Sequence, residues 1–455
     1  MSEPQVGTIA DLLGEARRHA LAFLDTLDTR PAAAAPGASI ASGNLPLGLG
    51  EVCALNAFVE RFEPHLSASP GPRYWGFVTG GATPAALAAD WLASAYDQNV
   101  SNDVGSIAST VERETVAGLR ELFALPADFH GVFVSGATAS NTAALATARQ
   151  AVYSQRGIDI AEQGLFAAPP LRILAGAAHS SIDKALAILG IGRRSLTRLP
   201  CLPGRTAIDT DALEAALQAA GDTPCIVVAS AGEVNTGDFD DLGRIAELCE
   251  QHGAWLHVDG AFGLFAALLP THAARLRGVE RADSVTVDLH KWLNVPYDSA
   301  VMLTRHPEAQ RAVFRASSAY LGDSTDPLHY TPENSRRFRA LPAWMSLAAY
   351  GREGVGAWVQ RHCELAQRLA EGIAQHPDLE VLTDVHLNIV CFALRTGDAA
   401  SRDALLDRLT RDGRVFLTPT VLFGRPAIRA AISNWRTAEQ DVEIALQALR
   451  DGLAG

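Results

Sequence analysis

Short apolar runs alternate with helical stretches between Gly131 and about Thr304. The runs are Val132-Phe133-Val134, Arg172-Ile173-Leu174, Cys225-Ile226-Val227-Val228, Trp255-Leu256-His257-Val258, Ser284-Val285-Thr286-Val287 and Val301-Met302-Leu303. Strands that are apolar throughout and separated by helices are typical of a mostly parallel sheet covered on both faces. Such sheets bind ligands at the carboxyl ends of their strands. The alternation therefore predicts an α/β domain with its functional residues at strand ends.

The length, charge and cysteine content of the chain indicate what kind of molecule it binds. A chain of 455 residues, 48% of them hydrophobic, can bury a large core, and its length favours two or three domains. The formal net charge of -13 comes without a basic run, which argues against nucleic acid or an anionic membrane surface and favours a small molecule. The six cysteines show no CxxC spacing, so we expect neither a metal site nor a disulfide framework.

Targeting signals are also absent from the sequence. The N-terminus lacks a basic segment followed by an apolar one, and no apolar stretch is long enough to span a bilayer. We expect a cytoplasmic protein that has no membrane partner.

A lysine stands at an unusual place, where the apolar run Ser284 to Val287 gives way to His290-Lys291. Burial disfavours the ammonium form, and a neutral amine is what a Schiff base with an aldehyde cofactor requires. The alternative is a lysine that snorkels from a strand end, which is the commoner case in an arbitrary sequence.

Asp259 ends another apolar strand, Trp255 to Val258. A carboxylate there is costly unless it pairs with a cation, and a protonated pyridine nitrogen is such a cation. The alternative is an aspartate that caps the next helix.

Two further strand ends carry polar residues. After Val134 comes a small-residue turn, Ser135 to Asn141, and then a helix, whose free N–H groups suit a phosphate or simply need a cap. His179 follows the apolar run Arg172-Ile173-Leu174, before a helix that we expect Ser180 or Ser181 to cap. A lone histidine at such a place is usually structural.

The stretch from Arg73 to Pro84 is aromatic and glycine-rich. It is either a tight turn before a buried helix or a pocket wall, because Gly80-Gly81 lets backbone approach a ligand closely.

In order and spacing, these motifs resemble the group II amino-acid decarboxylases, which include the aromatic-L-amino-acid and glutamate enzymes and in which His-Lys-Trp marks the cofactor lysine; here it is His290-Lys291-Trp292. The resemblance implies the fold type I transferase architecture (aspartate aminotransferase-like), with a large domain of mostly parallel sheet flanked by helices and a small C-terminal α+β domain. It implies pyridoxal 5'-phosphate as cofactor, and decarboxylation of an L-amino acid to the amine and carbon dioxide through a Lys291 aldimine and a quinonoid intermediate.

The resemblance also assigns roles to residues. Ala137 and Thr138 would hold the phosphate, and His290 belongs to the cofactor motif. His179 would lie over the ring, with Asp259 on the pyridine nitrogen and Ala261 packed against the ring. Tyr330, in the loop from Asp323 to Glu333, would protonate the α-carbon, although a plain surface loop is the alternative. One departure is Glu233-Val234, which stands where the family has Gly-Thr-Thr.

For the whole chain we expect an N-terminal helical arm and linker over residues 1–60, a large cofactor domain over 61–322 and a small domain over 323–455. The amphipathic stretch from Val6 to Leu27 and active sites built at a subunit interface favour a homodimer. The aromatics around Tyr74 favour an aromatic or apolar substrate. Other reactions from the same carbanion (transamination, aldol cleavage or oxidative deamination) and an inactive binding protein of this fold stay open.

Overall fold

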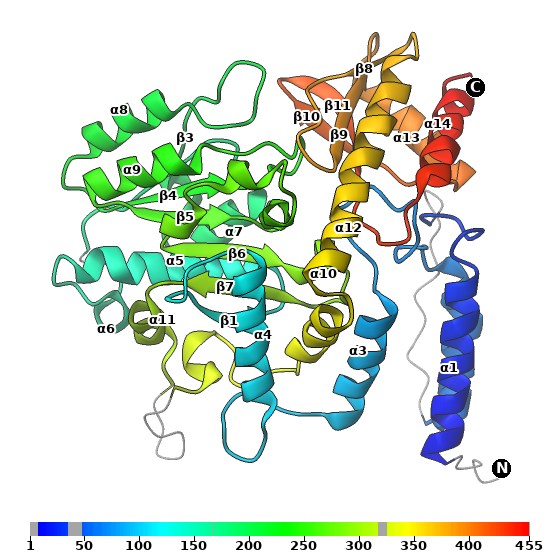
Figure 1. Cartoon of the computed structure of the whole chain (residues 1–455), viewed down its shortest axis with the longest axis horizontal. Helices are drawn as coiled ribbons and strands as arrows, with labels where there is room; N and C mark the ends of the chain where they lie inside the picture. Colours follow the sequence, from blue (N-terminus) through cyan, green and yellow to red (C-terminus); the bar gives the residue numbers. More distant parts are fainter. Residues whose placement is uncertain (1–7, 35–47, 167, 317–324, 455) are drawn as a thin grey trace.

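The computed structural model describes residues 8–34, 48–166, 168–316 and 325–454. Within them a seven-stranded sheet runs in the order β1-β7-β6-β5-β4-β2-β3 (Figure 1). Its strands are β1 (His130–Val134), β2 (Arg172–Ala175), β3 (Leu196–Arg198), β4 (Cys225–Ser230), β5 (Trp255–Asp259), β6 (Ser284–Asp288) and β7 (Ala300–Thr304). All six strands predicted from the apolar runs are present.

The sheet is mostly parallel, as expected. The pairs from β6 through β5, β4 and β2 to β3 are parallel, whereas β7 runs antiparallel to both β6 and β1. The sequence did not reveal β3, because this edge strand has only three residues and two of them are exposed.

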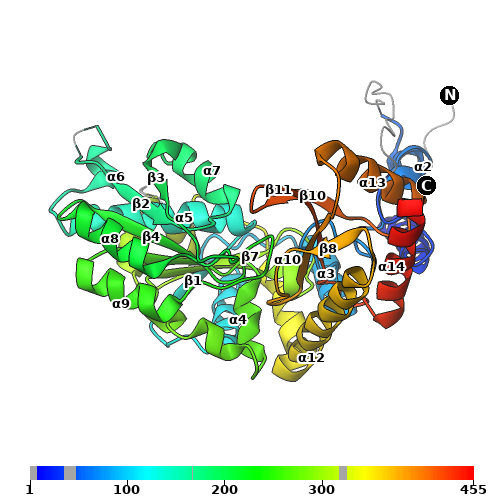
Figure 2. The ribbon, with the colours of Figure 1, turned by 90° about the horizontal axis from the view of Figure 1, so that it is seen from above.

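Helices cover both faces of this sheet. One layer holds α5 (Ala137–Ser154), α6 (Ile160–Gln163) and α7 (Ser180–Ile188), and the opposite layer holds α4 (Ala108–Leu122), α8 (Thr210–Ala220) and α9 (Leu242–His252), as Figure 2 shows. The strands between them are fully buried over most of their length, as in β6 and β7. The layers therefore leave the strand ends as the accessible part of the sheet.

The C-terminal part forms a second layer structure beside the first. Four antiparallel strands in the order β10-β11-β9-β8 pack against helices. The elements are α12 (Ala340–Ala374, interrupted at Gly351), β8 (Leu379–Val381), β9 (Ile389–Leu394), α13 (Ala399–Asp412), β10 (Thr418–Leu422), β11 (Arg425–Ala431) and α14 (Glu439–Ala454).

The run Arg414 to Leu417 lies before β10, and Phe416 forms an isolated bridge with Tyr74 outside the four-stranded sheet.

Further elements that bear on the site or the arm are α2 (Glu51–Arg61), α3 (Pro84–Tyr96), α10 (Leu289–Trp292), α11 (Pro307–Phe314) and the short 3-10 helix η6 (Pro327–Tyr330).

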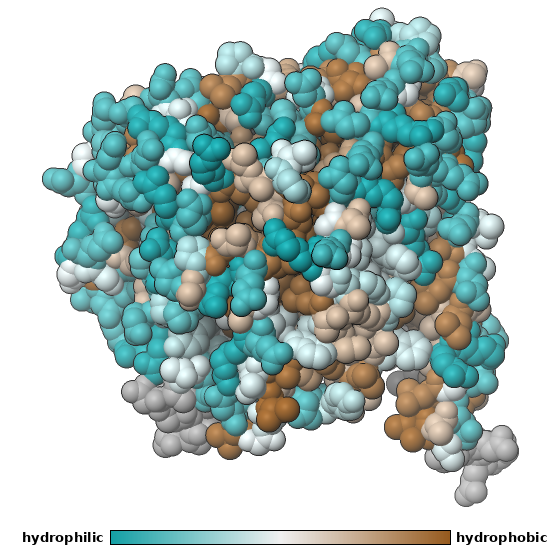
Figure 3. Space-filling view, in the orientation of Figure 1, coloured by the Kyte–Doolittle hydropathy of each residue, from teal (hydrophilic) through white to brown (hydrophobic). Residues whose placement is uncertain are grey.

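The N-terminal arm consists of α1 (Ile9–Asp25) and α2, and neither helix has a buried residue. Ile9, Leu13 and Phe58 are 78%, 57% and 49% exposed, and Figure 3 shows hydrophobic surface along this arm. The segment that follows α1 packs against the C-terminal part of the chain, since Ala32 is buried and its N–H donates to the Gly413 carbonyl. Ala35 and Pro36 lie outside the described residues.

No helix within the described ranges has the length and apolar character needed to cross a membrane. The division of the chain at 60/61 and 322/323 stays our proposal.

Candidate active site

The turn between β6 and α10 holds Lys291. Its Nζ pairs with Asp288 Oδ2 at 2.9 Å, and the lysine side chain is 20% exposed. Asp288 ends the strand and is itself buried; its Oδ1 accepts a hydrogen bond from the Ala137 N–H at 2.6 Å. The lysine amine is therefore held by a carboxylate that also touches the start of α5.

The rest of the His-Lys-Trp motif fixes this turn in place. The Trp292 indole N–H donates to His362 Nδ1 at 2.8 Å, and His362 Nε2–H donates to the Asn434 carbonyl at 2.8 Å. Full burial lowers the pKa of His362 to about 3, so its ring is neutral. His290 accepts at Nδ1 from the Ser299 N–H at 3.3 Å, and burial lowers its pKa. Trp292 thus anchors the lysine turn to the C-terminal part.

Asp259 lies at the end of β5. Its Oδ1 accepts from the Ala261 N–H at 3.2 Å, and its Oδ2 accepts from Asn141 Nδ2 at 3.0 Å. Asn141 Nδ2 also lies 3.0 Å from Ser181 Oγ, which in turn lies 2.8 Å from His179 Nδ1, so the two predicted residues lie close together. The structure therefore brings Asp259 and His179 to one place.

His179 itself caps α7. Its Nδ1 accepts from the Ser181 N–H at 3.2 Å and lies 2.8 Å from the Ser181 hydroxyl. The expectation that Ser180 or Ser181 caps this helix was wrong, because the imidazole does so. Burial lowers the pKa of His179, opposed by Asp259.

The start of α5 is the candidate phosphate site. Gly136 has no side chain to cap this helix. The Ala137 N–H already donates to Asp288 Oδ1, so the N–H groups of the first turn that remain available to an anion begin at Thr138. A Cβ built on Gly136 would lie 3.5 Å from His290 Cε1, so the backbone turn and the cofactor motif are in contact.

One cavity connects these residues. It is lined by Ala137, Ala177, His179, Ser230, Gly232, Glu233, Val234, Asp259, Ala261, Phe262 and Lys291. Five of the eight residues assigned from the sequence thus share one cavity, and Thr138 and His290 adjoin it along the chain. Phe262 was not predicted; its ring centre lies 5.8 Å from Lys291 Nζ.

Tyr330 is not part of this cavity. It lies in η6, packs against the buried cluster that includes Val132 and Met302, and lines a separate cavity with Glu112 and Gln310. Within one chain its hydroxyl therefore does not reach Lys291. Asp323 and Ser324 of the predicted loop lie outside the described residues.

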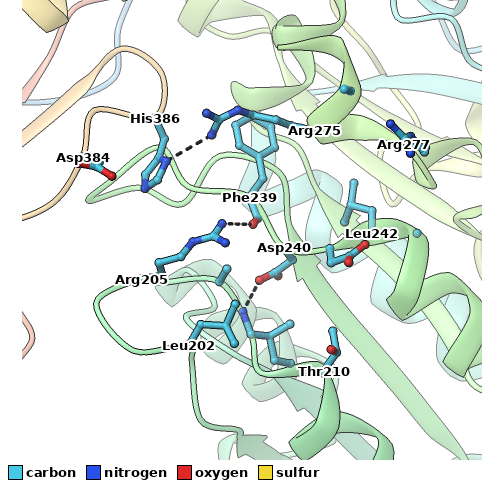
Figure 4. A pocket seen from close by; sticks show the side chains of 15 residues that line it. Leu202, Arg205, Thr210, Phe239, Asp240, Leu242, Arg275, Arg277, Asp384 and His386 are labelled. Carbon is cyan, nitrogen blue, oxygen red and sulfur yellow. Dashed lines mark hydrogen bonds between the residues drawn. The ribbon is translucent and has the colours of Figure 1, made fainter. Parts of the chain in front are cut away.

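A more spacious cavity, of about 710 Å³, lies elsewhere (Figure 4). Arg205, Arg275 and His386 line it between the two parts of the chain, with Asp240 at its base. None of the residues assigned from the sequence borders it, so cavity size does not locate the chemistry here.

Glu233 replaces the threonine of the related motif. It is 6% exposed and both carboxylate oxygens are used within its own turn, on the N–H groups of Asn235 and Thr236 and on the Asn235 amide. Burial raises its pKa. The glutamate therefore builds the cavity wall rather than offering a free carboxylate.

The aromatic segment divides in two. Tyr74 packs on Phe77 and Phe416, with ring centres 6.3 and 4.8 Å apart, and the Gly80 N–H donates to the His290 carbonyl. Trp75, by contrast, is 1% exposed in the C-terminal core, so its expected place in a pocket wall was wrong. Trp91 and Tyr96 lie exposed on α3 and do not line the cavity.

Besides Phe262, the sequence predictions did not include Asp288, Asn141 or Arg429. Asp288 carried a signal, because a carboxylate three residues before a lysine shares its turn. Asn141 and Arg429 carried none. Arg429 reaches over from β11 and donates to the carbonyls of Val234, at 3.2 Å, and Gly76, at 2.8 Å.

Comparison with known proteins decides the family. The model of the pyridoxal-dependent decarboxylase conserved domain matches residues 59–395. The chain belongs to this family. It is 31% identical to an aromatic-L-amino-acid decarboxylase of Bacillus atrophaeus over 82% of this chain and 79% of the relative. It is 32% identical to one of Sus scrofa over 85% and 84%. A crystal structure of Oryza sativa TDC with PLP and tryptamine superposes with a TM-score of 0.88 at 22% identity, covering 100% and 99% of the two chains.

The protein is therefore a pyridoxal-phosphate-dependent amino-acid decarboxylase of the aspartate aminotransferase-like fold. Its residues fit the cofactor, since an amine, an uncapped helix start and a strand-end carboxylate meet at one cavity.

Proposed function

We propose that Lys291, Asp259 and His179 carry the decarboxylation, and that Ala137, Thr138, Ala261 and His290 complete the cofactor site. The observation that carries this proposal is the shared cavity, in which groups from β5, α7 and the turn after β6 meet. Pyridoxal phosphate, once bound, supplies an aldehyde that joins amines and a ring that accepts the electron pair left by carbon dioxide.

Lys291 supplies the amine that condenses with this aldehyde. A neutral amine is the reactive form, and Asp288, 2.9 Å away, is placed to accept or return its proton. Asp288 also orients the amine toward the start of α5, where the N–H groups of the first turn would hold the phosphate.

Asp259 holds the proton of the pyridine nitrogen. Its two hydrogen bonds, from Ala261 and Asn141, fix the plane of the carboxylate, and a fixed anion stabilises the protonated ring without reorganising. Ala261, 8% exposed and part of the cavity lining, would pack against the ring.

His179 covers the face of the ring. Its Nδ1 is occupied by Ser181, so the free edge of the imidazole is Nε2. A neutral ring in this position excludes water and donates at Nε2, which orients a substrate carboxylate before carbon dioxide leaves.

The substrate class that we propose is an aromatic L-amino acid. The two relatives bear that activity in their names, and Tyr74, Phe77 and Phe416 form an aromatic cluster next to the backbone that contacts His290. Tyr297 adds a further ring 4.5 Å from that of His290.

The assembly that we propose is a homodimer. The arm of α1 and α2 exposes Ile9, Leu13 and Phe58, which a second subunit would cover. Tyr330 does not line the Lys291 cavity of its own chain. If it protonates the α-carbon, it therefore does so in the active site of the partner subunit. Light scattering should give twice the chain mass.

The test uses the wild-type holoenzyme and Lys291→Ala with a panel of amino acids. Wild type should release carbon dioxide and amine fastest from an aromatic amino acid, and borohydride should fix the cofactor on the peptide that contains Lys291. Lys291→Ala should lose both. Lys184 is the only other lysine in the sequence and is exposed, so Lys184→Ala is the matched control and should behave as wild type. Cofactor fixed on Lys291→Ala would refute the assignment, and a carbonyl product would indicate oxidative deamination instead.

A further inference from the structure

Asn141 is a buried hub beneath the active site. It lies on α5, is 0% exposed, and contacts three other side chains. Its Nδ2 lies 3.0 Å from Asp259 Oδ2 and 3.0 Å from Ser181 Oγ, and its Oδ1 lies 3.0 Å from His257 Nε2. The amide thus uses both N–H groups and its oxygen.

Asp259 decides which way the amide faces. An ionised carboxylate only accepts hydrogen bonds, so the atom of Asn141 beside it must be the nitrogen. The amide oxygen then faces His257, and that ring must carry its proton on Nε2.

The far side of His257 agrees with this orientation. Full burial lowers its pKa to about 4, so the ring is neutral and its Nδ1 is an acceptor. The Ser284 hydroxyl lies 2.9 Å from Nδ1 and is free to donate to it, because the Trp255 indole N–H already donates to the serine oxygen at 3.0 Å.

The other N–H of Asn141 sets the state of His179. Ser181 Oγ accepts this N–H, so the serine proton points at His179 Nδ1, 2.8 Å away. The same Nδ1 accepts the Ser181 backbone N–H at 3.2 Å. His179 therefore carries its proton on Nε2, toward the cavity.

We infer that Asn141 is a positioning residue that holds the Asp259 carboxylate and, through Ser181, fixes the Nε2–H form of His179. This one buried amide thereby links Asp259, the proposed partner of the pyridine nitrogen, to His179, the proposed residue at the ring face. This inference rests on the proposed roles of Asp259 and His179.

The experiment measures the ¹⁵N resonance of labelled cofactor in the holoenzyme, beside kcat and KM. Asn141→Leu keeps the branching at Cγ but removes all three hydrogen bonds. It should move the pyridine resonance toward the unprotonated value, as Asp259→Asn does, and lower kcat on the order of 10²-fold with little change in KM. Ser181→Ala should lower kcat less and leave the pyridine resonance in place.

The control is Thr147→Val, an equally buried site on α5 whose hydroxyl bonds only the Ala143 carbonyl. It should change neither readout. If Asn141→Leu does not fold, Asn141→Ala gives the same comparison, because it also removes all three hydrogen bonds and adds neither bulk nor a charge beside Asp259.

The outcomes separate the inference from the proposed function. If Asp259→Asn shifts the pyridine resonance and the Asn141 variants do not, the role of Asn141 alone is overturned. A resonance that Asp259→Asn leaves in place would overturn the pairing of Asp259 with the ring.

Discussion

At the scale of single residues, the site depends on charges held by short, fixed contacts. Lys291 pairs with Asp288, which lies on β6, and Asp259 accepts a hydrogen bond from Asn141, which lies on α5. Preorganised charges of this kind need no rearrangement during reaction, so a change of one atom should be costly.

Asp259→Asn tests this cost. The amide keeps the size of the carboxylate but cannot hold the proton of the pyridine nitrogen, so kcat should fall by about 10²-fold or more. The fold should stay largely intact, but the single amide oxygen can accept from Asn141 or from the Ala261 N–H and not from both, so the unfolding temperature should fall slightly. The control is Asp183→Asn, whose partner Arg198 is half exposed and whose loss should have little effect. Near wild-type turnover of Asp259→Asn would exclude the proposed pairing.

At the scale of elements, the site depends on close contact between segments. A Cβ on Gly80 would overlap the carbonyl oxygen of Lys291 and lie 2.7 Å from Asn294 Cγ. The glycine-rich segment therefore approaches the lysine turn itself, whereas its sequence had suggested close approach to a ligand.

Gly80→Ala should force the segment away from Lys291. We expect a loss of stability of about 1–3 kcal/mol from overpacking and reduced turnover, measured by urea unfolding and by amine release. Gly118→Ala is the control, because its nearest atom beyond the helix backbone lies 3.7 Å from the new Cβ and a helical site favours alanine. Wild-type turnover with Gly80→Ala would show that this contact does not position the lysine.

Tyr330 belongs to this scale because its reach depends on η6 and on a second subunit. If its hydroxyl protonates the α-carbon in the partner's site, Tyr330→Phe should slow amine formation by about 10²-fold and raise the share of carbonyl product. Cofactor absorbance should not change. The exposed Tyr96, on α3, gives the control variant Tyr96→Phe. Wild-type amine release by Tyr330→Phe would point instead to His179 or a water bound to it.

At the scale of the whole molecule, buried neutral histidines make stability depend on pH. Burial lowers the pKa of His257 to about 4 and that of His362 to about 3, from the ordinary histidine value of 6.5. Below pH 6.5 the unfolded chain binds protons that these folded rings do not, so the free energy of unfolding falls as pH falls. Asp240 acts in the opposite direction, since burial raises its pKa to about 6.

From pH 7 to pH 5 the two histidines together should cost about 4 kcal/mol, and Asp240 should return about 1.4 kcal/mol. Urea unfolding should therefore give a lower free energy of unfolding at pH 5 than at pH 7, because these two histidines outweigh Asp240. His362→Gln should remove about 2 kcal/mol of this dependence, while His65→Gln, at an exposed site, should not alter it. An unchanged pH dependence in His362→Gln would contradict the assignment.

The sequence alone determined the α/β class, the six strands of the apolar runs and the strand ends at which Lys291, Asp259 and His179 lie. These are local properties: an unbroken apolar run specifies a buried strand, and the residue after it is placed by the end of that strand. The aspartate at 288 could also have been read locally, because it shares a turn with Lys291.

Only the tertiary structure decided the rest. The reversal of β7, the burial of Trp75 in the C-terminal core and the reach of Arg429 to the cavity wall all depend on how distant segments pack. Asn141 is the clearest case, since helix position alone makes it a buried polar residue and only the meeting of α5, α7 and β5 gives it partners. A buried amide must satisfy its hydrogen bonds, but which groups satisfy them is set by contacts between residues as much as 118 positions apart.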